Sequence, residues 1–204
     1  NQKLSALYTF KGLNKVSVEK VEAGDIIAFS GIENISIGDT VSDNDDPKPL
    51  PRIEVDKPTV SMLFYVNNSP FAGQDGDYLT SRHLSERLNK EVLGNVSLQV
   101  VATDRPDIFE VRGRGELQMA VLIETMRREG YEFMVSKPKV ITQKEGDKIL
   151  EPMEKLFLDI PDDKVGIITE KLSLRKGRMT NMQNLGSGRV NLEFLIPSRG
   201  LIGF

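Results

Sequence analysis

The sequence predicts an α+β fold: a β-rich N-terminal segment followed by two ferredoxin-like (split βαβ) units, the second of which is truncated. Hydrophobic periodicity changes from the alternation of strands to the four-residue repeat of helices in the order strand, helix, strand, strand, helix, and this order occurs twice. Each unit contains a strand-to-helix junction, FEVRGRGELQMAV at 109–121 and LEFLIPSRGLIGF at 192–204, and the chain stops inside the last helix.

The composition is that of a globular protein. The 204 residues are 39% hydrophobic and 28% charged, which suits one large domain or two to three small ones. The absence of cysteine and the single histidine exclude disulfides, thiolate metal sites and an all-imidazole metal site. A net charge of −3 argues against indiscriminate coating of nucleic acid, so any RNA contact has to come from local basic patches. The chain lacks a signal-like start and a long apolar run, and we expect a cytoplasmic protein without membrane contact.

Residues 1–42 are predicted to form β structure with the turn spacing of a small barrel or sandwich. Val16, Val18 and Val21 indicate one strand, and the apolar run at 26–29 indicates a buried one. Glycine-aspartate pairs are predicted to form the turns between these strands.

Residues 43–57 turn acidic and then proline-rich, which excludes a helix and predicts a stiff connector. Asp43, Asp45 and Asp46 could bind a divalent cation, but the segment lacks the glycine and the terminal glutamate of a calcium loop. We therefore interpret it as a solvated linker and expect no metal ligand in the chain.

Residues 58–136 are predicted to form the first ferredoxin-like unit. Leu84, Leu88 and Val92 recur on one helix face, and Gly94 follows where a left-handed C-cap belongs. A second helix is predicted to stop at Gly130. The strands of this unit are predicted at 60–66, 97–102, 108–112 and 131–135, and the second helix at 116–129.

A connector at 137–148 leads to the second unit, 149–204. Leu156, Leu158 and Ile160 alternate in a strand, and a helix runs from the Pro-Asp-Asp start at 161–163 to Gly177. Further strands are predicted at 179–185 and 190–196, and the last helix at Ser198.

Several stretches in order resemble one protein family. VEAGDIIAFSGIENISIGDT (21–40), VRGRGELQMAVLIETMRREGYEFMVSKPKV (111–140) and ILEPMEKLFLDIPDDKVGIITEKLSLRKGRM (149–179) look like the second (β-barrel), third and fifth domains of elongation-factor-G-like translational GTPases. The BipA/TypA branch matches best. The short passage at 136–148 leaves no room for a fourth domain, and PFAGQDGDYLTSRHLSERL (70–88) and VNLEFLIPSRGLIGF (190–204) look like that branch.

The resemblance implies a GTPase that binds the ribosome and acts in large-subunit assembly and in translation under stress or cold. Its partners would be ribosomal RNA, ribosomal proteins and tRNA. The GTP and Mg site would lie upstream of Asn1, because the chain has neither a GxxxxGK[ST] phosphate loop nor an NKxD string. For this stretch we expect no cofactor, no catalytic residue and a monomer.

Basic residues at the two strand-to-helix junctions and at one helix end are the candidate RNA contacts. Glycines at a junction allow a tight turn, and exposed amides at a helix N-terminus attract phosphate. The alternative is structural: the glycines make the turn, Glu116 balances the helix dipole, and the cations at the helix end pair with free carbonyls. The candidates are Arg112, Arg114, Arg175, Lys176, Arg178 and Arg199.

A second function class stays open. Paired ferredoxin-like units can act as regulatory modules that bind a small ligand or a partner subunit at a sheet edge. A metabolic enzyme is disfavoured, because no carboxylate pair, nucleophile-base couple or metal cluster has a definite spacing.

Overall fold

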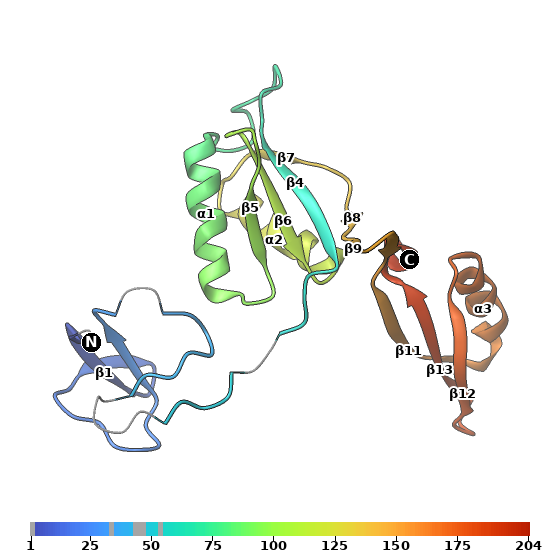
Figure 1. Ribbon diagram of the computed structural model, residues 1–204, viewed down its shortest axis with the longest axis horizontal. Helices are drawn as coiled ribbons and strands as arrows, with labels where there is room; N and C mark the ends of the chain where they lie inside the picture. Colours follow the sequence, from blue (N-terminus) through green and yellow to red (C-terminus); the bar gives the residue numbers. More distant parts are fainter. Residues whose placement is uncertain (1–2, 33–34, 43–47, 53–54) are drawn as a thin grey trace. The chain divides into compact units, whose positions relative to one another are not determined.

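The computed structural model describes residues 3–32, 35–42, 48–52 and 55–204 (Figure 1). The chain divides into two compact units, Asn1–Glu54 and Val55–Phe204, and the boundary falls within the predicted connector 43–57. It is a mixed α+β protein with several antiparallel sheets. Asp43, Asp45 and Asp46, the alternative cation ligands, lie outside the described residues. Within the described part of the chain, no helix has the length and hydrophobicity needed to span a membrane.

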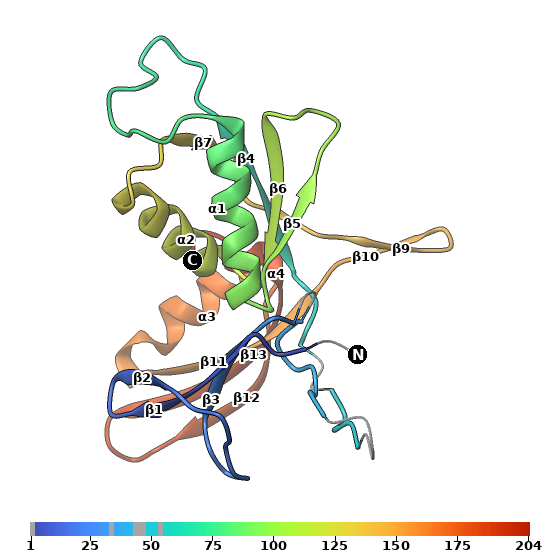
Figure 2. The same cartoon turned by 90° about the vertical axis from the view of Figure 1, so that its left-hand side faces the viewer.

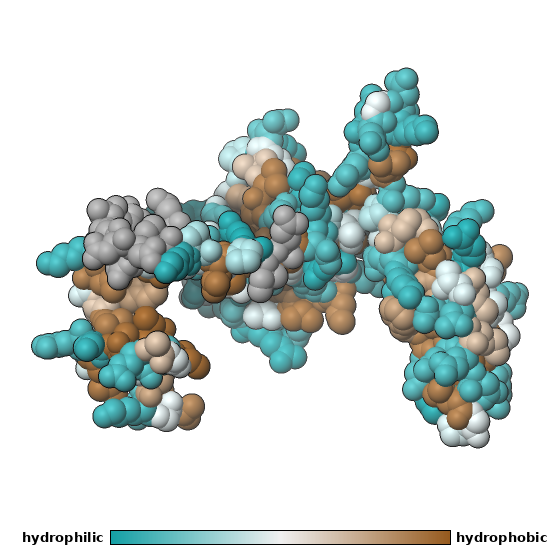
Figure 3. Space-filling model, turned by 60° about the horizontal axis from the view of Figure 1, so that its bottom comes forward, coloured by the Kyte–Doolittle hydropathy of each residue, from teal (hydrophilic) through white to brown (hydrophobic). Residues whose placement is uncertain are grey.

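The N-terminal unit contains one small sheet. Its antiparallel strands, in the order β2-β1-β3, are β1 (Ala6–Lys11), β2 (Asn14–Ser17) and β3 (Ile27–Ser30). The prediction of a buried strand at 26–29 is wrong in its burial: Ile26 is 79% exposed, and none of the described residues of this unit is fully buried. The reason is that no second layer of described residues covers the sheet, and Figure 3 shows hydrophobic residues on the surface of this unit.

The second unit begins with a sheet in the strand order β5-β6-β4-β7, all antiparallel, with β8 also paired to β4. Its elements follow the predicted order strand, helix, strand, strand, helix, strand. They are β4 (Val60–Val66), α1 (Ser81–Gly94), β5 (Gln99–Ala102), β6 (Ile108–Gly113), α2 (Glu116–Arg128), β7 (Phe133–Val135) and β8 (Lys139–Val140).

Both helices cover the same face of this sheet (Figures 1 and 2). Alternation along β4 places Val60, Met62 and Phe64 in the core, where they meet the apolar stripes of α1 and α2. The buried cluster consists of Met62, Phe64, Leu84, Leu88, Leu98, Val111, Met119, Leu122 and Met126.

The two helices end differently. The predicted stop at Gly130 is confirmed: its φ of 88° is left-handed, and the next N–H, of Tyr131, donates to the Met126 carbonyl at 3.0 Å. The predicted left-handed cap at Gly94 is wrong. Gly94 is the last residue of α1, and Asn95 caps the helix in an extended conformation with a φ of −136°. The Asn95 carboxamide then accepts from the Ser97 N–H and hydroxyl, which turns the chain without a left-handed glycine.

The predicted connector 137–148 contains regular structure. After β8, the strands β9 (Gln143–Glu145) and β10 (Lys148–Leu150) pair as a hairpin with a two-residue turn. This hairpin extends away from the neighbouring elements in Figure 2. Gly146 supplies the positive φ, 59°, that the first position of this turn requires.

The last sheet has the order β11-β13-β12 and is antiparallel. Its core joins Leu172 of the covering helix to alternate residues of β13, from Val190 to Ile196. The elements are β11 (Met153–Pro161), the 3-10 turn η1 (Asp162–Lys164), α3 (Val165–Leu174), β12 (Arg178–Asn184), β13 (Arg189–Pro197) and α4 (Ser198–Leu201). The predicted helix start at Ser198 is confirmed.

Candidate functional site

The turn between α3 and β12 has an unusual backbone. Lys176 has a φ of 68° and is the only residue other than glycine with a positive φ among those described. Its N–H donates to the Ser173 carbonyl at 3.0 Å, and the Gly177 N–H donates to the Leu172 carbonyl at 2.8 Å. This pair of hydrogen bonds closes a helix end that usually has glycine at the left-handed position. Here the glycine stands one residue later, because a Cβ on Gly177 would lie 2.9 Å from the Leu172 carbonyl oxygen.

Two cations of this turn are available to a partner. The side chains of Lys176 and Arg178 are exposed, and neither makes a hydrogen bond or an ion pair with any described residue. Arg178 is the first residue of β12, opposite Leu195 of β13, so a packed sheet fixes its backbone. The turn therefore presents two unneutralised charges from an ordered backbone.

Arg175, the third candidate of this turn, has internal partners. Its guanidinium donates to the carbonyls of Gly200, Ile202 and Gly203, each at 3.0 Å, and lies 5.3 Å from the ring centroid of Phe204. Arg175 therefore ties the end of α3 to residues 200–204.

Arg112 and Arg114 flank Gly113 at the first junction. Arg112 donates to Glu110 at 2.7 Å on the sheet face opposite the core, and this hydrogen bond lowers the pKa of Glu110. Its Nε is buried and has no partner among the described residues. Arg114 forms an ion pair with Asp56 and is half exposed.

Arg199 at the second junction pairs with Glu151 through bonds of 2.6 and 3.3 Å, and the pKa of Glu151 is lowered by this contact. The two junctions meet, because both carboxylate oxygens of Glu116 accept from the Gly203 N–H, at 2.8 and 3.0 Å. Glu116 thus binds another part of the chain as well as standing at the start of α2. Of the six candidates, the structure leaves Lys176 and Arg178 without internal partners among described residues.

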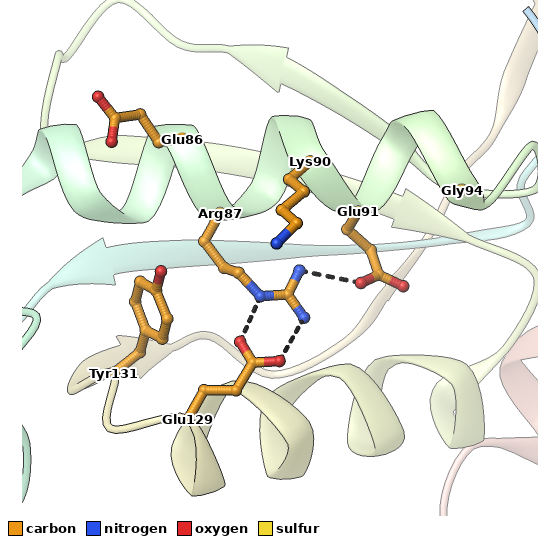
Figure 4. Close-up of a pocket in the computed structure, with 7 residues that line it drawn as sticks. All are labelled: Glu86, Arg87, Lys90, Glu91, Gly94, Glu129 and Tyr131. Atoms are coloured by element: carbon orange, nitrogen blue, oxygen red, sulfur yellow. Dashed lines mark hydrogen bonds and ion pairs between the residues drawn. The ribbon is translucent and has the colours of Figure 1, made fainter. Parts of the chain in front are cut away.

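A pocket of about 480 Å³ lies between α1 and α2 (Figure 4). Arg87 lies in it, 10% exposed, and donates to Glu129 at 2.5 and 3.1 Å and to Glu91 at 3.0 Å. The hydrogen bond from Arg87 lowers the pKa of Glu129. Since two carboxylates already accept from this guanidinium, Arg87 links α1 to the end of α2 and is not available to bind an anion. Its lining residues are Glu86, Arg87, Lys90, Glu91, Gly94, Glu129 and Tyr131.

Sequence reasoning missed the Arg87 pair, although a signal was present. Arg87 follows Leu84 by three residues and precedes Leu88, so it lies on the buried face of the helix. A cation at such a position needs a carboxylate partner.

Comparisons with known proteins agree with one another. Residues 148–204 match the family model "Elongation factor G C-terminus". The chain is 46% identical over 202 residues to "Large ribosomal subunit assembly factor BipA" of Bacillus subtilis, 48% over 204 residues to that of Salmonella typhimurium, and 51% over 193 residues to that of Haemophilus influenzae. These matches cover 95 to 100% of the chain and 31 to 34% of the relatives, so the chain spans about a third of their length.

A solved structure shares the fold. The crystal structure of ttk003000868 from Thermus thermophilus superposes with a TM-score of 0.56 at 15% identity, covering 99% of this chain and 47% of that one. Because identity near one half runs through the whole chain, the sequence comparison decides the family. The chain belongs, over the third of those proteins that it spans, to the BipA family of elongation-factor-G-like proteins.

Proposed function

We propose that this chain is a ribosome-binding part of a BipA-type assembly factor for the large ribosomal subunit. The observation that carries the proposal is the 46 to 51% identity, over nearly the whole chain, to proteins named as large ribosomal subunit assembly factors. The partners we propose are ribosomal RNA and ribosomal proteins, with tRNA as a further one, in the cytoplasm.

The α3–β12 turn is the proposed RNA contact. Its Lys176 and Arg178 are exposed and have no partner among the described residues, whereas Arg112, Arg114, Arg175 and Arg199 have carboxylate or carbonyl partners. Phosphate contacts need accessible cations, and they position a protein on nucleic acid without reading its sequence.

The arrangement of modules that we propose follows the family. Residues 1–42 would be the end of a β-barrel domain, 58–136 a ferredoxin-like domain of the third-domain type, and 149–204 one of the fifth-domain type. GTP and Mg would bind outside these 204 residues, and nucleotide-dependent changes there would alter affinity for the ribosome. Roles under stress or cold, and a monomeric state, are part of the same proposal.

Charge removal at the turn tests the RNA contact. We expect Lys176→Gly combined with Arg178→Gln to weaken co-sedimentation with purified large ribosomal subunits. The slope of log affinity against log salt should fall in magnitude by about 1.5, since each lost phosphate contact removes roughly 0.7 to 0.9. Glycine at position 176 also relieves the left-handed backbone, so the variant should be as stable as the parent or more stable by about 1 kcal/mol.

A charge-matched control lies in the same sheet. Lys155→Gln with Arg189→Gln removes two positive charges that already pair with Glu193 and Asp159. We expect this control to keep the parent salt slope. Equal slopes for the parent and for the Lys176 and Arg178 variant would refute the proposed contact.

A further inference from the structure

The loop between β4 and α1, residues 67–79, is long and ordered. It projects from the end of the sheet in both ribbon views (Figures 1 and 2). Most connections in compact domains are about 4 to 6 residues long, and longer surface loops packed by their own contacts are frequently functional. The proposed RNA contact makes no use of this loop.

One carboxylate organises the loop. Asn67 Nδ2 donates to Glu132 Oε1 at 2.5 Å, and the Gly73 N–H lies 3.0 and 3.1 Å from the two carboxylate oxygens. The N–H groups of Asp75 and Gly76 donate to Glu132 Oε2 at 3.0 and 3.2 Å. The backbone N–H groups of Asp75 and Gly73 stabilise the charged carboxylate and thereby lower the pKa of Glu132.

The part of the loop that leads into α1 is also held by hydrogen bonds. The Tyr78 N–H donates to the Gly130 carbonyl at 3.1 Å, and the Glu132 N–H donates to the Tyr78 carbonyl at 3.2 Å. The rings of Tyr78 and Tyr131 lie 4.8 Å apart, centroid to centroid. A Cβ on Gly76 would lie 2.6 Å from the Gly130 carbonyl oxygen, so the backbone approaches too closely for any other residue.

This ordered loop exposes an aromatic side chain. Phe71 is 69% exposed, although its backbone is held by a turn in which the Ala72 N–H donates to the Ser69 carbonyl at 3.1 Å. An exposed aromatic on an ordered backbone is a favourable binding anchor, because little conformational entropy is lost when it is buried.

The negative charge of the loop favours a basic protein surface as its partner. Residues 67–79 contain Asp75 and Asp77 and no lysine or arginine. Phosphate groups would be repelled by these carboxylates, whereas a basic protein surface would be attracted. We propose that loop 67–79 is a protein-docking site in which Phe71 enters an apolar pocket with a basic rim on a protein component of the ribosome. The identity of the particle rests on the proposed function.

Photocross-linking tests the partner class. The 204-residue chain carrying p-benzoylphenylalanine in place of Phe71 is irradiated on purified 70S ribosomes, and a second sample carries it in place of Leu174, the exposed last residue of α3 beside the charged turn. We expect position 71 to yield a product with a ribosomal protein, whose size ribonuclease leaves unchanged, and position 174 to yield a product with RNA, which ribonuclease shortens. RNA products alone from position 71, or none while position 174 reacts, would overturn the docking site and leave the proposed function standing. No product from either position, with no co-sedimentation, would overturn both.

Two substitutions separate the anchor from its scaffold. Phe71→Ala should lower ribosome affinity about tenfold, the effect of losing a moderate anchor, with the loop still ordered. Glu132→Gln should lower affinity as well and also speed amide exchange at Gly73, Asp75 and Gly76, because the amide of glutamine cannot accept at both positions. Phe157→Ala, at an exposed phenylalanine on β11, is the control and should bind as the parent does. Unchanged affinity of Phe71→Ala would contradict the proposal.

Discussion

Two glycines that each follow an arginine at a strand-to-helix junction differ in their steric surroundings. Arg114-Gly115 and Arg199-Gly200 both lie where a strand passes into a helix. A Cβ on Gly200 would lie 2.6 Å from the backbone carbonyl oxygen of Arg175. A Cβ on Gly115 would meet nothing within 4 Å, and its φ of −179° is extended backbone that any residue adopts. Sterics therefore require glycine at the second junction and not at the first.

Matched serine substitutions test this difference. Gly200→Ser should lower the free energy of unfolding by about 1 to 3 kcal/mol, the usual range for overpacking against a backbone that cannot move freely. Gly115→Ser should leave it unchanged or raise it by about 0.3 kcal/mol, because serine at this N-cap can accept from a free helix N–H. Urea denaturation of both variants measures the difference. Equal losses would show that close packing does not distinguish the two glycines.

One glutamate of helix α2 pairs with two arginines of the same helix. Glu124 accepts from Arg127 at 2.8 and 3.0 Å and from Arg128 at 2.8 Å. These hydrogen bonds lower the pKa of Glu124 to about 2, from an ordinary value of 4.5. Because the folded-state pKa is the lower one, the contribution to stability is present above pH 4.5 and is lost as the pH falls toward 2.

The lowered pKa of Glu124 can be measured by NMR titration of its side chain. Its pKa should lie well below 4.5 at low ionic strength and should rise toward 4.5 in about 1 M salt, since these side chains are exposed and salt screens them. Glu124→Gln should unfold with a weaker acid dependence than the parent. An unshifted pKa at low salt would contradict the pairing.

The sequence predicted elements best where local chemistry decides them. Gly130 ends α2 because the chain there needs a left-handed residue, and only glycine takes that conformation without cost. Gly94 misled the prediction, because Asn95 and its side chain close α1 instead. The hairpin at 143–150 was not predicted, since its strands are three residues each and too short for a periodic pattern.

The candidate site was partly predictable for a related reason. Composition indicated which cations cluster along the chain, but their partners come from distant segments: Arg175 bonds to residues 25 to 28 positions away, and Arg114 pairs with Asp56. The same holds for Glu132, whose loop partners lie 56 to 65 residues upstream. Only a folded chain distinguishes a cation with internal partners, such as Arg175, from an available one such as Lys176.

At the scale of the whole molecule, the two units differ in how they bury apolar surface. Residues 55–204 contain two hydrophobic clusters, one under each of the two sheets that helices cover. The described residues of the N-terminal unit include none that is fully buried, so each of their apolar side chains contributes less burial than the core residues of 55–204. The charged turn and the ordered loop both belong to the unit that has a core.

A cryo-electron microscopy map of the 204-residue chain mixed with large ribosomal subunits would show directly whether the chain binds and which residues face RNA. We expect bound chain with Lys176 and Arg178 beside ribosomal RNA phosphates. A map with no bound chain, or with the α3–β12 turn facing solvent in a bound one, would contradict this expectation.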